Sequence, residues 1–351
     1  MSASSTRTSI SILMLHGFSQ SGKLFQIKSR PLVQELTGKL ARFYQVAEKD
    51  VNFVFPDGPI RLNSGVVAGR WMDDSPSAKS SDLFAWSKEP DVYGTVQYPG
   101  LDQSLSMLFR LSRDHGPFTG VIGFSSGATL ASMFVSWCES DHIPGRREAL
   151  RTMCESCVGH ELKGILETPP QAPLDFAILC AGFPGPAQYY RGFYEPELST
   201  ATVHVVGDLD SMVPPTKSME LINRCRDPMF IKHKGTHHLP RDRVTINRIV
   251  ASIHVLLASQ MDRARSMERT ECAVVDELRY QQGDNCFQLF KQMSATTLPK
   301  SESSSDSEKG SDRLDDAASS VASACDSTGS SRSRRSYRRQ IARRYQVIRT
   351  R

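Results

Sequence analysis

Short apolar runs alternate with longer amphipathic segments along the first 260 residues of the chain. The runs of apolar and β-branched residues predict strands, and the segments with helical spacing between them predict helices. We expect strands near residues 10–15, 51–55, 119–123, 175–180, 202–206 and 229–232. We expect helices near residues 28–46, 101–114, 126–138, 214–224 and 241–260. A regular alternation of this kind predicts an α/β fold, with a mostly parallel, doubly wound sheet and helices on both faces.

Two long segments interrupt this alternation, at about residues 73–99 and 138–173. The first holds Trp86, Tyr93 and Tyr98 among polar residues, and the second is loop-like in its composition. Connections of this length in a domain are often functional. Two interpretations stand for each insertion: a lining or lid of a substrate cleft, or structural decoration.

The C-terminal part of the chain differs in composition from the rest. The folded domain is expected over residues 8–260, followed by a helical or irregular extension over residues 261–300. From residue 301 serine and charged residues dominate, which predicts a disordered tail over residues 301–351. Residues 301–330 carry 2 basic and 7 acidic residues, and residues 331–351 carry 9 arginines and no acid.

The arginine-rich end of this tail has three interpretations. Helical spacing of Tyr337, Ile341, Tyr345 and Ile348 favours a basic amphipathic helix that contacts a membrane surface or a partner. A nuclear-import or nucleic-acid patch has the same charge, and so does a solvated tail that contacts its own acidic neighbour. Since no DNA-binding fold is visible, nucleic acid is not an expected partner.

The segment Gly123-Phe124-Ser125-Ser126-Gly127 carries the clearest chemical signal. It is a G-x-S-x-G pattern between a predicted strand and a predicted helix, which is the nucleophile elbow of α/β hydrolases. Small residues are needed at both ends of this sharp turn, which exposes the serine hydroxyl at the N-terminus of a helix. Ser125 is therefore the expected nucleophile.

An elbow predicts that an acid and then a histidine follow along the chain, each after a strand. The predicted strand 202–206 ends in Asp208 and Asp210, which compete for the role of the acid. We favour Asp210 because it lies further into the loop. The acid fixes the tautomer of the histidine and stabilises its charged form.

Three histidines, His233, His237 and His238, compete for the role of the base that takes the proton of the serine. We favour His237 because it follows Gly235-Thr236, where the loop can turn back over the site.

Backbone N–H groups are expected to bind the negative charge that develops on the substrate. The usual pair consists of the residue after the nucleophile, Ser126, and a residue in the first strand-to-helix loop. Phe18 is the candidate in that loop, because it follows the apolar strand 10–15 and His16-Gly17. Phe18, Trp71 and Phe183 are candidates for the lining of the substrate pocket, and an apolar pocket favours a lipophilic acyl chain.

The chain resembles the FSH family of serine hydrolases, which are small α/β hydrolases common in fungi. The resemblance covers about residues 8–258, and its most specific part is the run from Gly116 to Ala128. The other matching segments are Leu15-His16-Gly17-Phe18, Phe55-Pro56-Asp57-Gly58-Pro59, Arg70-Trp71, Gly207-Asp208-Leu209-Asp210 and Gly235-Thr236-His237-His238-Leu239-Pro240.

This resemblance implies an α/β-hydrolase fold with Ser125, Asp210 and His237 as nucleophile, acid and base. It implies an esterase or thioesterase that needs no cofactor. Several members of the family hydrolyse the thioester that holds a polyketide on its synthase, which would make a synthase carrier domain a partner. The alternative function class is a binding or scaffold protein that keeps the fold without useful turnover.

Composition adds expectations about location and metals. The sequence has no run of 18 apolar residues and no apolar core of a signal peptide, which predicts a cytoplasmic protein, or a nuclear one through its basic tail. Its 8 cysteines are irregularly spaced and are expected to be free thiols. Zinc or a redox pair is an alternative for the cluster Cys138, His142, Cys154, Cys157 and His160. A plain insertion is the favoured interpretation, so no metal is expected.

Overall fold

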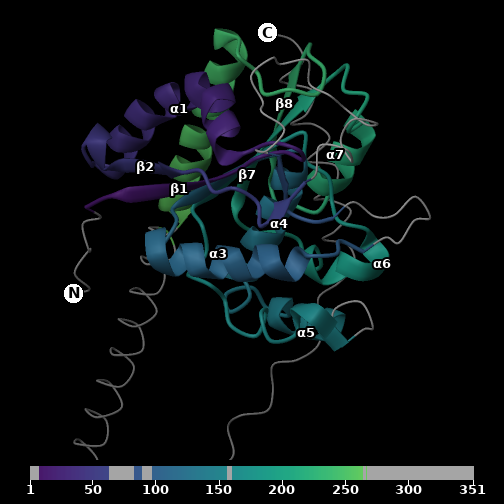
Figure 1. Cartoon of the computed structure of the whole chain (residues 1–351). Helices are drawn as coiled ribbons and strands as arrows, with labels where there is room; N and C mark the ends of the chain where they lie inside the picture. Colours follow the sequence, from purple (N-terminus) through teal and green to yellow (C-terminus); the bar gives the residue numbers. More distant parts are fainter. Residues whose placement is uncertain (1–7, 63–82, 89–96, 156–159, 264–265, 267–351) are drawn as a thin grey trace, which may run out of the picture. The chain divides into compact units, whose positions relative to one another are not determined.

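Six parallel strands form the central sheet, in the order β2-β1-β5-β6-β7-β8 (Figure 1). The computed structural model describes residues 8–62, 83–88, 97–155, 160–263 and 266. The chain divides into two units after residue 279, and all the described residues belong to the first. The strands are β1 (Ile10–Leu15), β2 (Val51–Val54), β5 (Gly120–Phe124), β6 (Phe176–Cys180), β7 (Ala201–Gly207) and β8 (Met229–His233). The prediction of a parallel α/β sheet is confirmed.

The strands are apolar throughout because helices cover both faces of the sheet. Along β1, Leu13 and Leu15 join the hydrophobic cluster on one face, and Ile12 and Met14 join the cluster on the other. One face is covered by α3 (Leu101–His115), α4 (Ser126–Cys138) and α7 (Pro215–Ile222). The opposite face is covered by α1 (Gly22–Tyr44) and the helix Arg243–Arg263 (Figure 1).

The helix Arg243–Arg263 is, among the described residues, the one helix long and apolar enough to cross a membrane by length and composition. Its buried residues Ile246, Ile249 and Ile253 recur at helical spacing and belong to the cluster on the sheet. The ring of His254 lies 5.9 Å from the ring of Phe43 in α1. The apolar composition of this helix therefore serves its packing against the sheet and α1.

Helix α1 begins at Gly22, earlier than the predicted residue 28. Ser21 Oγ accepts a hydrogen bond from the backbone N–H of Leu24, at 3.2 Å. Asp57 Oδ1 accepts one from the N–H of Gly22, at 2.7 Å. Side-chain acceptors at a helix N-terminus satisfy N–H groups that have no partner within the helix, which explains the earlier start.

The second insertion contains a helix, α5 (Arg146–Glu155), so the loop-like interpretation is wrong for these residues. Arg146 is completely buried, and its Nη2 lies 3.3 Å from Oε2 of Glu139, just after the end of α4. Oε1 of Glu139 accepts hydrogen bonds from the N–H groups of Ser199 and Thr200. This buried network ties the insertion to α4 and to the loop before β7.

A small antiparallel sheet follows β2. It pairs β3 (Ile60–Arg61) with β4 (Phe84–Ala85), which leads into Trp86. The described part of the chain also contains the short helices α6 (Ala187–Tyr190), η1 (Glu48–Asp50), η2 (His160–Leu162) and η3 (Arg191–Phe193). Trp71, Tyr93, Cys157 and the predicted tail lie outside the described residues.

Removal of the Glu139 carboxylate should strongly destabilise the domain, because Arg146 would keep a buried charge without its partner. We expect Glu139→Ala to lower the free energy of unfolding by about 3–5 kcal/mol. Urea denaturation followed by circular dichroism measures the change. Glu148→Ala is the control, because it breaks an exposed pair with Arg151 and should leave the midpoint unchanged. Equal midpoints for the two variants would contradict this account of the network.

Two buried histidines should make the domain sensitive to acid. Burial lowers the pKa of His16 to about 4 and the pKa of His204 to about 3, from 6.5. Below pH 6.5 these two histidines bind protons in the unfolded chain but stay neutral in the folded chain. Each histidine should therefore lower the free energy of unfolding by about 1.4 kcal/mol per pH unit as the pH falls from 6.5 toward 4.

Urea denaturation at pH 7, 6 and 5 measures this slope. His204→Leu should reduce the slope by the contribution of one proton, about 1.4 kcal/mol per pH unit. A slope that does not respond to His204→Leu would contradict the prediction.

Candidate active site

Ser125 lies in the turn between β5 and α4, as expected for a nucleophile elbow. Its backbone has φ 55° and ψ −121°, a conformation that non-glycine residues rarely adopt. A hydrogen bond from its N–H to the carbonyl of Cys180, at 2.9 Å, fixes the turn to β6. This strained backbone presents the hydroxyl at the N-terminus of α4.

The two glycines of the motif are needed because other backbone segments lie against them. A Cβ atom on Gly123 would overlap the carbonyl oxygen of Gly127. A Cβ atom on Gly127 would overlap the carbonyl oxygens of Leu15 and His16, at the end of β1. The turn around Ser125 is therefore packed directly against the loop that follows β1.

The structure brings Ser125, His237 and Asp210 together. His237 Nε2 lies 3.0 Å from Ser125 Oγ, and its Nδ1 lies 2.7 Å from Asp210 Oδ2. The other carboxylate oxygen of Asp210 accepts hydrogen bonds from the N–H groups of Met212 and Val213, at 3.0 and 2.8 Å. These bonds orient the carboxylate, which in turn orients the imidazole ring toward the serine.

This group is largely shielded from water. The side chain of Asp210 is 1% exposed and that of His237 is 12% exposed. The His237 ring also packs against Phe124, the residue before Ser125, with 4.9 Å between ring centroids. Low exposure strengthens the interaction between a carboxylate and an imidazolium, because water screens it less.

The competing acid and bases lie in other contacts. Asp208 is half-exposed and pairs with Nζ of Lys232 at 2.8 Å. The His233 ring packs edge-on against the His238 ring, with centroids 5.3 Å apart. Nδ1 of His238 lies 3.3 Å from the hydroxyl of Thr236. The geometry around Ser125 is therefore built from Asp210 and His237, the residues that we favoured.

The backbone N–H groups of Phe18 and Ser126 are the predicted donors to an oxyanion. Within the part of the chain that the structure describes, neither N–H donates a hydrogen bond. Ser126 is the first residue of α4. An N–H at this position has no partner within the helix and belongs to the positive end of the helix dipole. Phe18 lies in the loop that contacts the Ser125 turn through His16 and Gly127.

The structure describes only some of the residues predicted to line the substrate pocket. Trp71 lies outside the described residues. Phe183 follows β6 and is half-buried, and its carbonyl oxygen accepts a hydrogen bond from the Thr129 hydroxyl in α4, at 2.7 Å. Phe183 follows β6 and Ser125 follows β5, so both lie at the C-terminal edge of the sheet. The role of Phe183 in the pocket stays a prediction.

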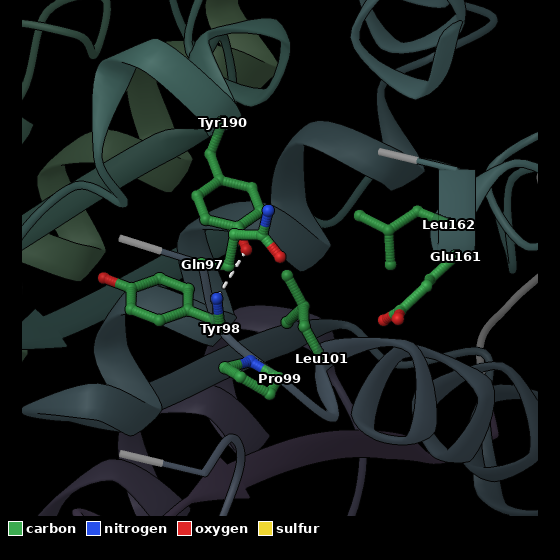
Figure 2. A pocket seen from close by; sticks show the side chains of 7 residues that line it. All are labelled: Gln97, Tyr98, Pro99, Leu101, Glu161, Leu162 and Tyr190. Carbon is green, nitrogen blue, oxygen red and sulfur yellow. Dashed lines mark hydrogen bonds between the residues drawn. The ribbon is translucent and has the colours of Figure 1, made fainter. Parts of the chain in front are cut away.

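A small pocket lies where the two insertions meet (Figure 2). Gln97 and Tyr98 come from the first insertion, Glu161 comes from the second, and the rings of Tyr98 and Tyr190 stack 5.1 Å apart. Its volume of about 40 Å³ has room for only a few water molecules. It is therefore too small to receive an acyl chain, and it indicates that the insertions pack against one another.

Trp86, in the insertion that was a candidate cleft lining, is instead 3% exposed. Its indole N–H donates a hydrogen bond to the carbonyl oxygen of His16, at 2.7 Å. It therefore lies behind the loop that carries Phe18. Among the described residues no group of three or more histidine, cysteine or acidic side chains is arranged to hold a metal ion.

Comparison with known proteins identifies the family of this chain. The chain is 27% identical over 246 residues to a protein of Schizosaccharomyces pombe named dihydrofolate reductase, covering 67% of this chain but only 45% of that protein. It is 27% identical over 245 residues to Family of serine hydrolases 2 of Saccharomyces cerevisiae, covering 68% of this chain and 95% of that protein.

Among solved structures, acyl-protein thioesterase 2 of Zea mays aligns with a TM-score of 0.43 and 16% identity, over 71% of this chain and 94% of that one. The model of the family Serine hydrolase (FSH1) matches residues 4–249, which include Ser125, Asp210 and His237. The chain therefore belongs to the FSH1 family of serine hydrolases.

Proposed function

We propose that this protein is an esterase or thioesterase that hydrolyses acyl groups through an acyl-enzyme on Ser125. The observation that carries the proposal is the pair of short contacts at His237, 3.0 Å to Ser125 Oγ and 2.7 Å to Asp210 Oδ2. A base within hydrogen-bond reach of a serine in a strained turn is what nucleophilic catalysis requires. Membership of the serine hydrolase family supports the same activity.

In the first step, Ser125 Oγ attacks the carbonyl carbon of the substrate while its proton moves to His237 Nε2. Asp210 stabilises the imidazolium that forms, through the hydrogen bond from Nδ1. The negative charge on the carbonyl oxygen is bound by the N–H groups of Phe18 and Ser126. The intermediate collapses, and His237 gives its proton to the departing alcohol or thiol.

In the second step, water attacks the ester of Ser125 and loses its proton to His237. The same N–H groups bind the second tetrahedral intermediate. Its collapse returns the proton to Ser125 Oγ and releases the carboxylic acid. Each residue ends in the state in which it began, so no cofactor is needed.

The leaving group is either an alcohol or a thiol, because both depart through the same protonation by His237. We extend the proposal to thioesters that hold a polyketide on a synthase carrier domain, on the family resemblance alone. Comparison of p-nitrophenyl esters with acyl-pantetheine thioesters of the same chain length separates the two classes. A higher kcat/KM for the pantetheine thioesters would support a carrier-bound substrate, and hydrolysis of oxygen esters alone would exclude it.

Ser125→Ala should abolish labelling by a fluorophosphonate and lower ester turnover by at least about 10⁴-fold, because the nucleophile is lost. Fluorescence of the labelled band and initial rates measure both. Ser136→Ala is a matched control, because Ser136 also lies in α4 and its buried hydroxyl has no hydrogen-bond partner among the described residues. A folded wild type that neither labels nor hydrolyses esters would overturn the proposal and favour a binding or scaffold protein.

Asp210→Asn should lower kcat by about 10²–10⁴-fold, because an amide holds the wrong tautomer of His237 and leaves its charged form unpaired. Asp208→Asn should change kcat by less than about twofold, because this carboxylate is half-exposed and faces Lys232. Steady-state rates on one ester compare the two variants. The assignment of the acid would be wrong if Asp208→Asn were the more damaging change.

A further inference from the structure

The loop that carries Phe18 is held from outside the main sheet. It connects β1 to α1 over residues 16–21 and includes Ser19 at φ 55°. The carbonyl of His16 accepts the indole N–H of Trp86 at 2.7 Å, and the carbonyl of Gln20 accepts the N–H of Phe84 at 2.9 Å. Both ends of the loop are therefore bonded to β4 and the residue that follows it.

The side chain of His16 adds two further bonds. The N–H of Gly58 points at Nε2, at 2.9 Å, so that nitrogen must be the acceptor. The proton of the neutral ring then lies on Nδ1, which donates to the carbonyl of Gly17 at 2.8 Å. Burial lowers the pKa of His16 to about 4, so the ring keeps this neutral form at neutral pH.

Trp86 is fixed on its other side as well. Its ring lies against the His16 ring, with 4.6 Å between centroids. Its carbonyl oxygen accepts the hydroxyl of Ser104 in α3, at 2.6 Å. A chain of direct contacts therefore runs from α3 through Trp86 and His16 to the residue before Phe18.

The loop has little freedom to move toward the nucleophile. A Cβ atom on Gly17 would lie 2.8 Å from Cδ1 of Phe124, the residue before Ser125. A shift in the opposite direction would move the N–H of Phe18 away from the oxyanion. Because donors stabilise a transition state only where they are already in place, a displacement of about 1 Å is costly.

We propose that His16 and Trp86 are positioning residues that fix the oxyanion-binding loop, and that β4 is the rigid support through which they act. This inference rests on the proposed hydrolase function. Neither side chain touches the substrate or exchanges a proton with it. Their effect is on the stabilisation of the negatively charged intermediate, with little effect on the binding of the neutral substrate.

Trp86→Phe tests the proposal, because it keeps an aromatic ring at this position and removes the indole N–H donor to the carbonyl of His16. We expect kcat to fall about 10–100-fold with KM within about twofold. Trp137→Phe is the matched control, since the buried indole of Trp137 also donates to a backbone carbonyl, that of Thr168, at 2.9 Å. Trp137 lies about 18 Å along α4 from Ser125, so this variant should keep kcat within about threefold.

Two ketone inhibitors separate positioning from a general loss of structure. A trifluoromethyl ketone forms a hemiketal anion on Ser125 and needs the oxyanion donors, whereas the corresponding methyl ketone binds as a neutral molecule. Trp86→Phe should weaken the first inhibitor about 10–100-fold and leave the second within about twofold. Equal losses for both inhibitors, or equal kcat for the Trp86 and Trp137 variants, would overturn the proposal.

The histidine is tested by partial rescue. His16→Gln retains an acceptor for Gly58 and a donor for Gly17, and should keep a higher kcat than His16→Ala at similar KM. Equal kcat for these two variants would contradict the role of the ring nitrogens. Failure of the wild type to hydrolyse any ester would overturn the hydrolase function itself, whereas an active wild type with insensitive variants would overturn only this inference.

Discussion

The close approach of two backbone segments is the constraint on which the site depends. The turn after Ser125 lies so near the end of β1 that Gly127 has no space for a side chain. Ser125 is held in its strained conformation because β5 and β6 fix the turn on one side and this contact fixes it on the other. The same contact brings the first N–H of α4 beside the loop of Phe18. One packing arrangement therefore fixes the turn of the proposed nucleophile and places it beside the loop of the proposed oxyanion donors.

The orientation of Asp210 and His237 depends on hydrogen bonds rather than on backbone packing. Asp210 bonds to the backbone of its own loop at Met212 and Val213, so its carboxylate is fixed before it meets His237. An immobile acceptor costs little reorganisation when the imidazole gains its proton. Asp208 is only two residues away, but it points to Lys232 and solvent. Position within the loop, and not residue type, separates the two aspartates.

Much of this arrangement could be predicted from the sequence, because its signals are local. The buried strands are continuous apolar runs, and the elbow is a short motif between a strand and a helix. Long-range partners gave no such signal. Trp86 has the same polar neighbours whether it lines a cleft or lies behind a loop, and the pairing of Arg146 with Glu139 places two charged residues where composition predicts solvent.

The start of α1 at Gly22 has a related explanation, since Asp57, which accepts the N–H of Gly22, is distant in the sequence. Such contacts depend on which loops the fold brings together at one edge of the sheet. These contacts can therefore be predicted only after the order of the strands in the sheet is known, whereas the strands can be predicted from the local sequence.

A histidine suits position 16 because its ring offers a donor and an acceptor that are joined rigidly. Gly17 needs a donor and Gly58 needs an acceptor, and the ring supplies both without a rotatable bond between them. A flexible amide could make the same bonds only by losing more conformational entropy. Burial keeps the ring neutral, so this pattern stays fixed while His237 gains and loses a proton. In the proposed mechanism the two histidines therefore have different roles: His16 stays neutral and keeps the oxyanion donors in place, and His237 carries the proton.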